Sequence, residues 1–300
     1  MTANPPTASN SNLRGIAAMI LSAATFVTND TFMKLAMANL PPLEVLTLRG
    51  IAGCLWCLPT LAVLGLLGHL PGALHRFVLL RAAFESAAVV LFVILLARMP
   101  IGDLTAIMQT TPLMVVLGVA LIWREKIGPL RLVLCGVGFL GALLVAQPGT
   151  ASASAIAPLG FFAAVFAAAR DLTARRIPSE IPPLIATFTT IVMVMTTAAI
   201  GSWLFETAVR PAMSDLGLIV VAGLLLMFGN MFIILAFRLG TAGAVAPFYY
   251  AFTFWAVLSS VLVFGAIPNP LAILGIGLIL GSGLAVLLFD QRRPTAAPAI

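Results

Sequence analysis

Charged residues are scarce in this sequence. Of 300 residues, 16 are Lys or Arg and 10 are Asp or Glu, so charged types make up 9% of the chain, against about 25% in soluble globular proteins. A soluble surface of this size needs far more charge, which excludes a cytosolic enzyme and a disordered chain. Because hydrophobic types reach 61%, the composition predicts an all-α integral membrane protein.

Cysteine and histidine are also rare, and no catalytic motif is present. Cys54, Cys57 and Cys135 lie in apolar stretches, which excludes a disulfide-rich scaffold. Cys54 and Cys57 have a C-x-x-C spacing, but no second pair or nearby His supports a metal or redox site, so we interpret them as packing residues. His69 and His75 share one loop without metal-ligand spacing. In the absence of a phosphate-binding loop or a catalytic triad, we expect no metal, no cofactor and no enzymatic activity.

The apolar residues fall into segments of membrane-spanning length. A bilayer core of about 30 Å requires about 20 helical residues. Proline and glycine turns divide the chain into ten such segments, which we expect to be helices at 14–38, 43–68, 74–99, 101–123, 128–147, 156–177, 182–205, 214–238, 241–265 and 269–289.

Basic residues predict the orientation of these spans. Twelve of them fall on one set of alternate connections, namely Arg14, Arg76, Arg81, Arg124, Lys126, Arg131, Arg170, Arg175, Arg176, Arg238, Arg292 and Arg293. Four fall on the other set, namely Lys34, Arg49, Arg98 and Arg210. Both termini are therefore expected in the cytoplasm, with the protein in the inner membrane.

The chain also contains an internal similarity. Arg98 and Arg238 end two apolar segments 140 positions apart (238 − 98), and the same offset relates Gly141 to Gly281. We expect two halves, 1–150 and 151–300, each with five helices. Because five is odd, the second half enters the membrane in the opposite sense, as in secondary transporters. Chance similarity between apolar helices is the alternative.

Polar residues inside the first span are candidates for a substrate site. Thr25 and Asn29 continue a polar stripe that begins at Ser22, and we expect them to line a cavity. Asp30 and Lys34 are four residues apart, so we expect an intrahelical ion pair.

Two further charged groups each permit two interpretations. Glu85 either pairs with Arg81, four residues earlier, or faces the cavity and exchanges a proton. Arg170 either receives a substrate carboxylate or belongs to a cytoplasmic basic cluster with Arg175 and Arg176. We favour the structural interpretation in both cases.

The fourth and ninth spans carry the remaining candidates. Gln109 and Tyr249 fall at equivalent depth in the two halves, and we expect both to contact the substrate, together with Tyr250 and Trp255. The aromatic residues are alternatively interfacial belt residues. Pro112 and Pro247 are expected to bend these two helices beside the cavity.

Two sequence stretches resemble a known family. KLAMANLPPLEVLTLR contains Lys34, Pro42 and Arg49, and TTPLMVVLGVALIWREKIGPLRLVLCGVGFLGALL contains Pro112 and Glu125 before spaced glycines. These residues resemble the EamA-type, ten-helix family of the drug/metabolite transporter superfamily. Among its members, the chain is similar to the bacterial exporters of aromatic amino acids.

The resemblance implies a secondary transporter that moves a small metabolite by alternating access. It favours an aromatic or hydrophobic amino acid, with drugs, nucleosides or vitamins as the alternatives. An intramembrane enzyme or a lipid scramblase is the alternative of another class. The expected partners are the substrate and the lipid bilayer, with no nucleic acid, and the expected state is a monomer.

Overall fold

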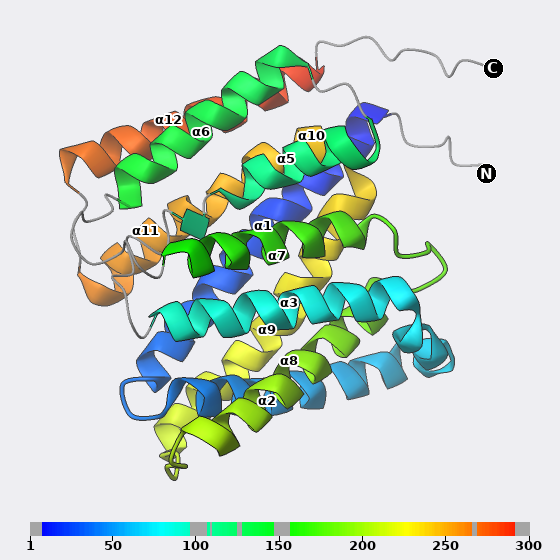
Figure 1. The fold of residues 1–300 in the computed structure, drawn as a ribbon, viewed down its shortest axis with the longest axis vertical. Helices are drawn as coiled ribbons and strands as arrows, with labels where there is room; N and C mark the ends of the chain where they lie inside the picture. The colour runs from blue at the N-terminus through cyan, green and yellow to red at the C-terminus, as the bar shows by residue number, and fades with distance from the viewer. Residues whose placement is uncertain are drawn as a thin grey trace.

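The described part of the chain is all-helical. The computed structural model describes residues 8–96, 107–108, 110–124, 128–146, 157–265 and 269–291, and these contain helices and no strand. The elements are α1 (Ala8–Ala36), α2 (Pro42–Val63), the 3-10 helix η1 (Leu67–Leu74), α3 (Arg76–Leu96), α5 (Thr111–Ile122), α6 (Pro129–Ala146), α7 (Ala157–Ala174), α8 (Pro183–Phe205), α9 (Met213–Leu239), α10 (Ala242–Val245), the 3-10 helix η2 (Ala246–Tyr250), α11 (Ala251–Phe264) and α12 (Pro270–Gln291) (Figure 1). The all-α prediction is confirmed.

Five helices of the described chain are long and apolar enough to cross a membrane. They are Ser11–Ala36, Pro42–Val63, Arg76–Leu95, Pro183–Phe205 and Met213–Leu239. Their outward faces remain apolar, because large hydrophobic side chains such as Leu21, Leu55 and Trp203 are exposed. Exposed apolar surface on this scale fits a hydrocarbon surrounding rather than water.

Proline sets several helix starts. Pro42, Pro129, Pro183 and Pro270 are each the first residue of their helices. Proline lacks an N–H group, and the first turn of a helix leaves that group without an intrahelical acceptor, so the cost of proline is small there. The sequence therefore locates these starts closely.

The ninth predicted span is interrupted, because α10 gives way to η2 before α11 begins at Ala251. In the fourth, Thr110 forms a turn directly before α5, and Pro112 lies in the first turn of that helix. Because 101–106 and 109 lie outside the described residues, the bend expected at Pro112 stays a prediction. Pro247 lies within η2.

The helices pack mainly in four pairs. α1 lies along α9, α3 along α7, α2 along α8 and α6 along α12 (Figure 1). α2 also contacts α9, and α3 contacts α8. The closest approaches need glycine, because a Cβ atom on Gly223 of α9 would lie 2.7 Å from the backbone nitrogen of Gly53 in α2.

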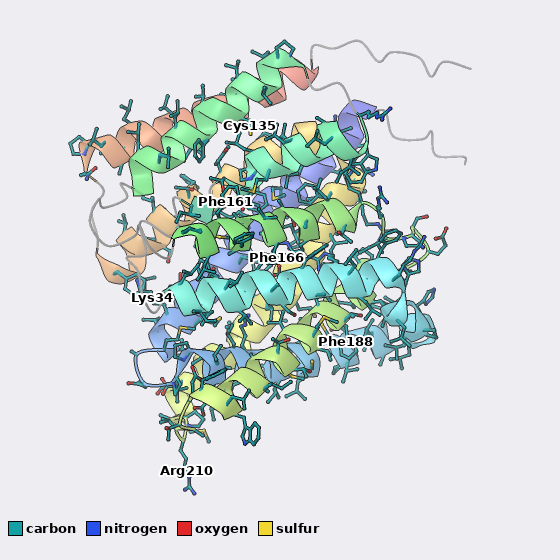
Figure 2. The ribbon with its side chains drawn as sticks, viewed as in Figure 1. Lys34, Cys135, Phe161, Phe166, Phe188 and Arg210 are labelled. Atoms are coloured by element: carbon teal, nitrogen blue, oxygen red, sulfur yellow. The ribbon has the colours of Figure 1, made fainter. Side chains whose placement is uncertain are left out.

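The two ends of the bundle differ. The start of α1 and the end of α12 lie at one end (Figure 1), whereas Lys34 and Arg210 lie toward the other end (Figure 2). At this second end, the Glu206 carboxylate accepts the backbone N–H groups of Leu43 and Glu44, each at 2.9 Å. The connection between α8 and α9 therefore caps the first turn of α2.

Candidate functional site

A buried polar network occupies the interior of the bundle. It contains charged residues from α2, α3 and α7, all with little exposed surface, namely Arg49, Arg81, Glu85, Arg170 and Asp171. Buried neutral partners come from α1, α8 and α9, namely Asn29, Thr190 and Asn230. Charged groups within a membrane protein are costly and usually serve a substrate or ion pathway. The network is therefore the candidate functional site.

Arg170 connects three elements of the network. Its NH1 atom lies 2.5 Å from Oε2 of Glu85 on α3, and its Nε atom lies 2.7 Å from Oδ1 of Asp171. NH2 donates to Oδ2 of Asp171 at 3.1 Å and to the hydroxyl of Tyr249 in η2 at 2.6 Å. The preferred interpretation, a basic cluster with Arg175 and Arg176, is therefore wrong for Arg170. The physical reason is that Arg170 lies one turn deeper in α7, where two carboxylates face it.

Arg81 is fully buried, with 0% of its surface exposed. Its NH1 atom donates to the Thr190 hydroxyl at 2.7 Å, and NH2 donates to Oδ1 of Asn230 at 3.4 Å. Within the described chain Arg81 forms no ion pair with Glu85, so that expected pair is wrong. Arg170 is closer to Glu85 and takes its carboxylate.

Arg49 is also buried, with 6% of its surface exposed. Its NH1 atom donates to Oδ1 of Asn29 at 3.4 Å, and Asn29 Nδ2 donates to Oδ1 of Asp30 at 2.8 Å. Asp30 itself is exposed, and its carboxylate interacts electrostatically with Arg49 and Glu85.

Lys34 lies apart from this cluster. Its ammonium is 4.8 Å from the centroid of the Phe264 ring, which is a cation–π arrangement. No ion pair joins Asp30 to Lys34 in the described part of the chain, so the expected intrahelical pair is wrong. Lys34 contacts the Phe264 ring of α11 instead, and Asp30 accepts a hydrogen bond from Asn29.

Aromatic rings form a wall beside the network. Tyr249 stacks on Phe252 with ring centroids 5.1 Å apart, and Phe252 stacks on Phe26 at 6.1 Å. A Cβ atom on Gly229 would lie within 3.1 Å of the Phe26 ring, so the absence of a side chain lets this ring lie flat on α9. Such a wall offers a planar ligand a stacking surface.

A narrow cavity opens in the network. It is lined by Leu46, Arg49, Gly50, Glu85, Val89, Thr190, Ile191, Val194, Leu226 and Asn230. The empty space is about 280 Å³ counted out to its mouth, and its interior admits roughly one water molecule. The bundle is therefore closed around these polar groups, and a metabolite needs the helices to move before it enters. No group of three His, Cys, Asp or Glu side chains in the described chain is placed to hold a metal ion.

Several predicted residues lie outside the network. The Thr25 hydroxyl donates to Leu21 and Ser22 carbonyls of its own helix. Tyr250 is fully buried, and its ring packs over Gly138 of α6. Trp255 packs edge-on against Phe254, with centroids 5.5 Å apart.

Two predicted residues cannot be placed. Gln109 and Glu125 lie outside the described residues. The proposed pairing of Gln109 with Tyr249 therefore stays a prediction.

Sequence reasoning missed part of the network. Asp171, Thr190 and Asn230 were not among the predicted site residues. The sequence did contain one signal, because Asp171 adjoins Arg170 in an apolar helix and intramembrane charges usually pair. Thr190 had no such signal, since hydroxyls in membrane helices mostly bond to their own backbone.

The interior location of three arginines also corrects the orientation count. Arg49, Arg81 and Arg170 are buried in the bundle, so they are not loop charges. Removing them leaves ten residues (12 − 2) against three (4 − 1). The excess of basic residues therefore stays on the same set of connections, and the predicted orientation is unchanged.

Comparison with known proteins identifies the family. The model of the EamA-like transporter family matches residues 13–147. A riboflavin transporter of Rhizobium johnstonii is 30% identical over 80% of this chain and 78% of its own length. The chain belongs to the EamA-like transporter family. The resemblance to this family of the drug/metabolite transporter superfamily is thereby confirmed, and the protein is a transporter of this type.

Other relatives and a solved structure agree with this assignment. A pseudopaline exporter of Pseudomonas aeruginosa is 26% identical over 91% of this chain and 95% of that protein. A riboflavin transporter of Vibrio cholerae is 26% identical over 94% of this chain and 95% of that protein. One crystal structure has a TM-score of 0.80 at 18% identity, covering 95% of this chain and 100% of the other. That likeness establishes the fold alone.

Proposed function

We propose that this EamA-type protein is a secondary transporter that moves a small metabolite across the bacterial inner membrane by alternating access. The buried network of Arg49, Glu85 and Arg170 beside a closed cavity carries this proposal. Its charges are far from water, and such groups typically line the substrate pathway of a carrier. Closure around the cavity fits a carrier, which exposes its site to one side at a time, better than an open pore.

We propose an architecture of ten spans in two inverted repeats. Helix starts recur at similar offsets, with Pro42 and Pro183 separated by 141 positions (183 − 42) and Thr111 and Ala251 by 140 (251 − 111). The packing supports the same relation. The proposed repeat exchanges α1 with α7, α2 with α8 and α3 with α9. Under this exchange the α1–α9 contact corresponds to the α7–α3 contact, and the α2–α9 contact corresponds to the α8–α3 contact.

The substrate we propose is a polar metabolite with a planar aromatic part. The wall of Phe26, Tyr249 and Phe252 supports the planar part, because its rings lie within stacking distance of one another. Several relatives are named riboflavin transporters, which favours a vitamin with a fused ring system. An aromatic amino acid, as the sequence resemblance suggested, fits the same wall and is the second candidate.

Transport into proteoliposomes tests this function. We expect saturable uptake and counterflow for riboflavin or tryptophan and much less for leucine. Tyr249→Ala removes both the stack on Phe252 and the hydrogen bond to Arg170. A hydrogen bond to a charged group contributes about 1.5–3 kcal/mol, so uptake should fall about tenfold or more.

Thr196→Ala is the matched control, because its hydroxyl donates to the Val192 carbonyl of its own helix. Equal uptake by the two variants at equal protein levels would contradict the assignment of the wall. Flux that does not saturate would indicate a channel, and covalent conversion of a substrate would indicate an enzyme.

A further inference from the structure

The ion pairing inside the network is unequal. Arg170 is in contact with two carboxylates, those of Glu85 and Asp171. Arg49 and Arg81 form no ion pair with any described residue, and their only hydrogen-bond acceptors are neutral oxygens. Two buried guanidinium groups are thus left without a carboxylate at contact distance.

Both guanidinium groups also have unused donors. The Nε atoms of Arg49 and Arg81 are buried and have no hydrogen-bond partner among the described residues. An unsatisfied buried donor is costly, and more so when it is charged. Evolution retains such a cost most readily where a ligand supplies the acceptor.

The unpaired charge faces the cavity. Arg49 and Glu85 line it, and so do Thr190 and Asn230, the two acceptors that hold Arg81. Glu85 is occupied by Arg170. Of the two charged residues that line the cavity, Arg49 is therefore the one without an ion pair in the described chain.

Asp30 does not occupy the donors of Arg49. Its electrostatic interaction with Arg49 is attractive, but the two groups form no ion pair, and the Asp30 carboxylate accepts its hydrogen bond from Asn29. Asn29 separates Asp30 from Arg49, because its amide contacts both. Arg49, which lines the cavity, thus keeps a donor without an acceptor in the described chain.

We infer that this cavity binds an anionic group of the transported substrate, a carboxylate or a phosphate, with Arg49 as its direct ligand. The inference rests on the proposed transport function. Arginine suits this task because its planar fork donates two parallel hydrogen bonds to either oxyanion. Arg81 is a positioning residue that holds Thr190 and Asn230 and adds positive potential. The aromatic wall then receives the planar part of the same molecule.

Substrate pairs that differ at the anionic group test the inference. One pair is tryptophan and tryptophanamide, and the other is riboflavin 5′-phosphate and riboflavin. In proteoliposomes the unmodified protein should transport the member with the oxyanion in preference to its partner in at least one pair. The first pair reports a carboxylate and the second a phosphate, so the two sources are distinguished.

Arg49→Gln removes the charge with little change in length. It should reduce the affinity for the preferred anionic compound about ten- to hundredfold. The affinity for the member of the same pair that lacks the oxyanion should change by no more than about twofold. Arg49→Lys keeps the charge but loses the fork, so its effect should be intermediate. Lys34→Gln is the matched control, because it removes one positive charge that lies over Phe264 outside the cavity.

Three outcomes separate this inference from the proposed function. Saturable transport that ignores the anionic group, or an Arg49→Gln variant that matches Lys34→Gln, overturns the inference and leaves the carrier function intact. No saturable flux of any of the four compounds overturns both. If Arg49→Gln does not elute as a folded protein in gel filtration, the test uses Arg49→Lys in its place. An Arg49→Lys variant that transports both substrate pairs like the unmodified protein then overturns the inference.

Discussion

At the scale of single residues, Arg170 is the most connected charged group of the site. It holds Glu85 of α3, Asp171 of its own helix and Tyr249 of η2. Each carboxylate depends on this cation, because burial removes the water that otherwise stabilises its charge. Stability and site geometry therefore depend on the same side chain.

Arg170→Gln should destabilise the protein strongly. The substitution leaves two buried carboxylates without their cation, and breaking a buried pair in this way costs about 3–5 kcal/mol. We expect a clear fall in the midpoint of thermal unfolding in detergent. The double variant Arg170→Gln, Glu85→Gln should recover part of the loss, because one uncompensated charge is removed with its partner.

Arg176→Gln provides the control for this prediction. Arg176 lies just beyond the same helix, is exposed, and contacts only the rings of Trp123 and Phe77 among charged or aromatic partners in the described chain. Its loss should change stability by about 1 kcal/mol or less. Midpoints that are equal for Arg170→Gln and Arg176→Gln would refute the structural role of Arg170.

Residue identity predicted the members of the site better than their pairing. Asn29, Glu85, Arg170 and Tyr249 were candidates because each is polar within an apolar segment, and the structure brings them into one network. Their partners could not be read from the sequence. The i, i+4 rule favours pairs within one helix. Arg170 and Glu85 instead are 85 positions apart in the chain and meet between two different helices.

At the scale of helices, close backbone approach governs how α2 meets α9. Gly223 of α9 faces Ala52 and Gly53 of α2, and a Cβ atom there would lie 2.7 Å from both a backbone nitrogen and the Ala52 Cβ atom. Backbone cannot rotate aside as a flexible side chain can, so the helices have to separate to accept any side chain. Small residues serve this purpose in membrane bundles generally.

Gly223→Ala should therefore lower stability, whereas Gly217→Ala in the same helix should not. Overpacking typically costs about 1–3 kcal/mol. A Cβ atom on Gly217 meets no atom within 4 Å, and alanine favours the helix over glycine by about 1 kcal/mol. Thermal unfolding of both variants in one detergent gives the comparison, and a Gly223→Ala variant at least as stable as Gly217→Ala would contradict it.

Helix starts were more predictable than helix interruptions. Pro42, Pro183 and Pro270 begin helices as the turn signals indicated. Pro112 and Pro247 occur in apolar sequence segments, where proline either bends a helix or separates two, and the sequence does not distinguish these results. The choice depends on what neighbouring helices offer the freed backbone groups.

At the scale of the whole molecule, the two ends of the bundle bear different charge. Arg76, Arg176 and Arg238 belong to the end where α3 begins and where α7 and α9 finish. Arg210 belongs to the opposite end (Figure 2). The positive-inside rule predicts that the first end faces the cytoplasm.

Cysteine labelling in intact cells tests this orientation. In a variant with Cys54, Cys57 and Cys135 replaced by alanine, we introduce either Arg210→Cys or His69→Cys, both at exposed positions. A membrane-impermeant maleimide should label Arg210→Cys directly and His69→Cys only after the membrane is opened. The reverse pattern would invert the orientation, and labelling of both without opening would refute a single fixed topology.

The sequence by itself determined that this chain resides in a membrane, where most of its helices begin, and which polar residues lie within apolar segments. Composition and local turn chemistry act over a few residues, so they are readable without the fold. Only the tertiary structure decided which charges meet. Arg170 takes both carboxylates, while Arg49 and Arg81 keep only neutral partners. That division depends on distances across the bundle, which helix packing sets and no local pattern encodes.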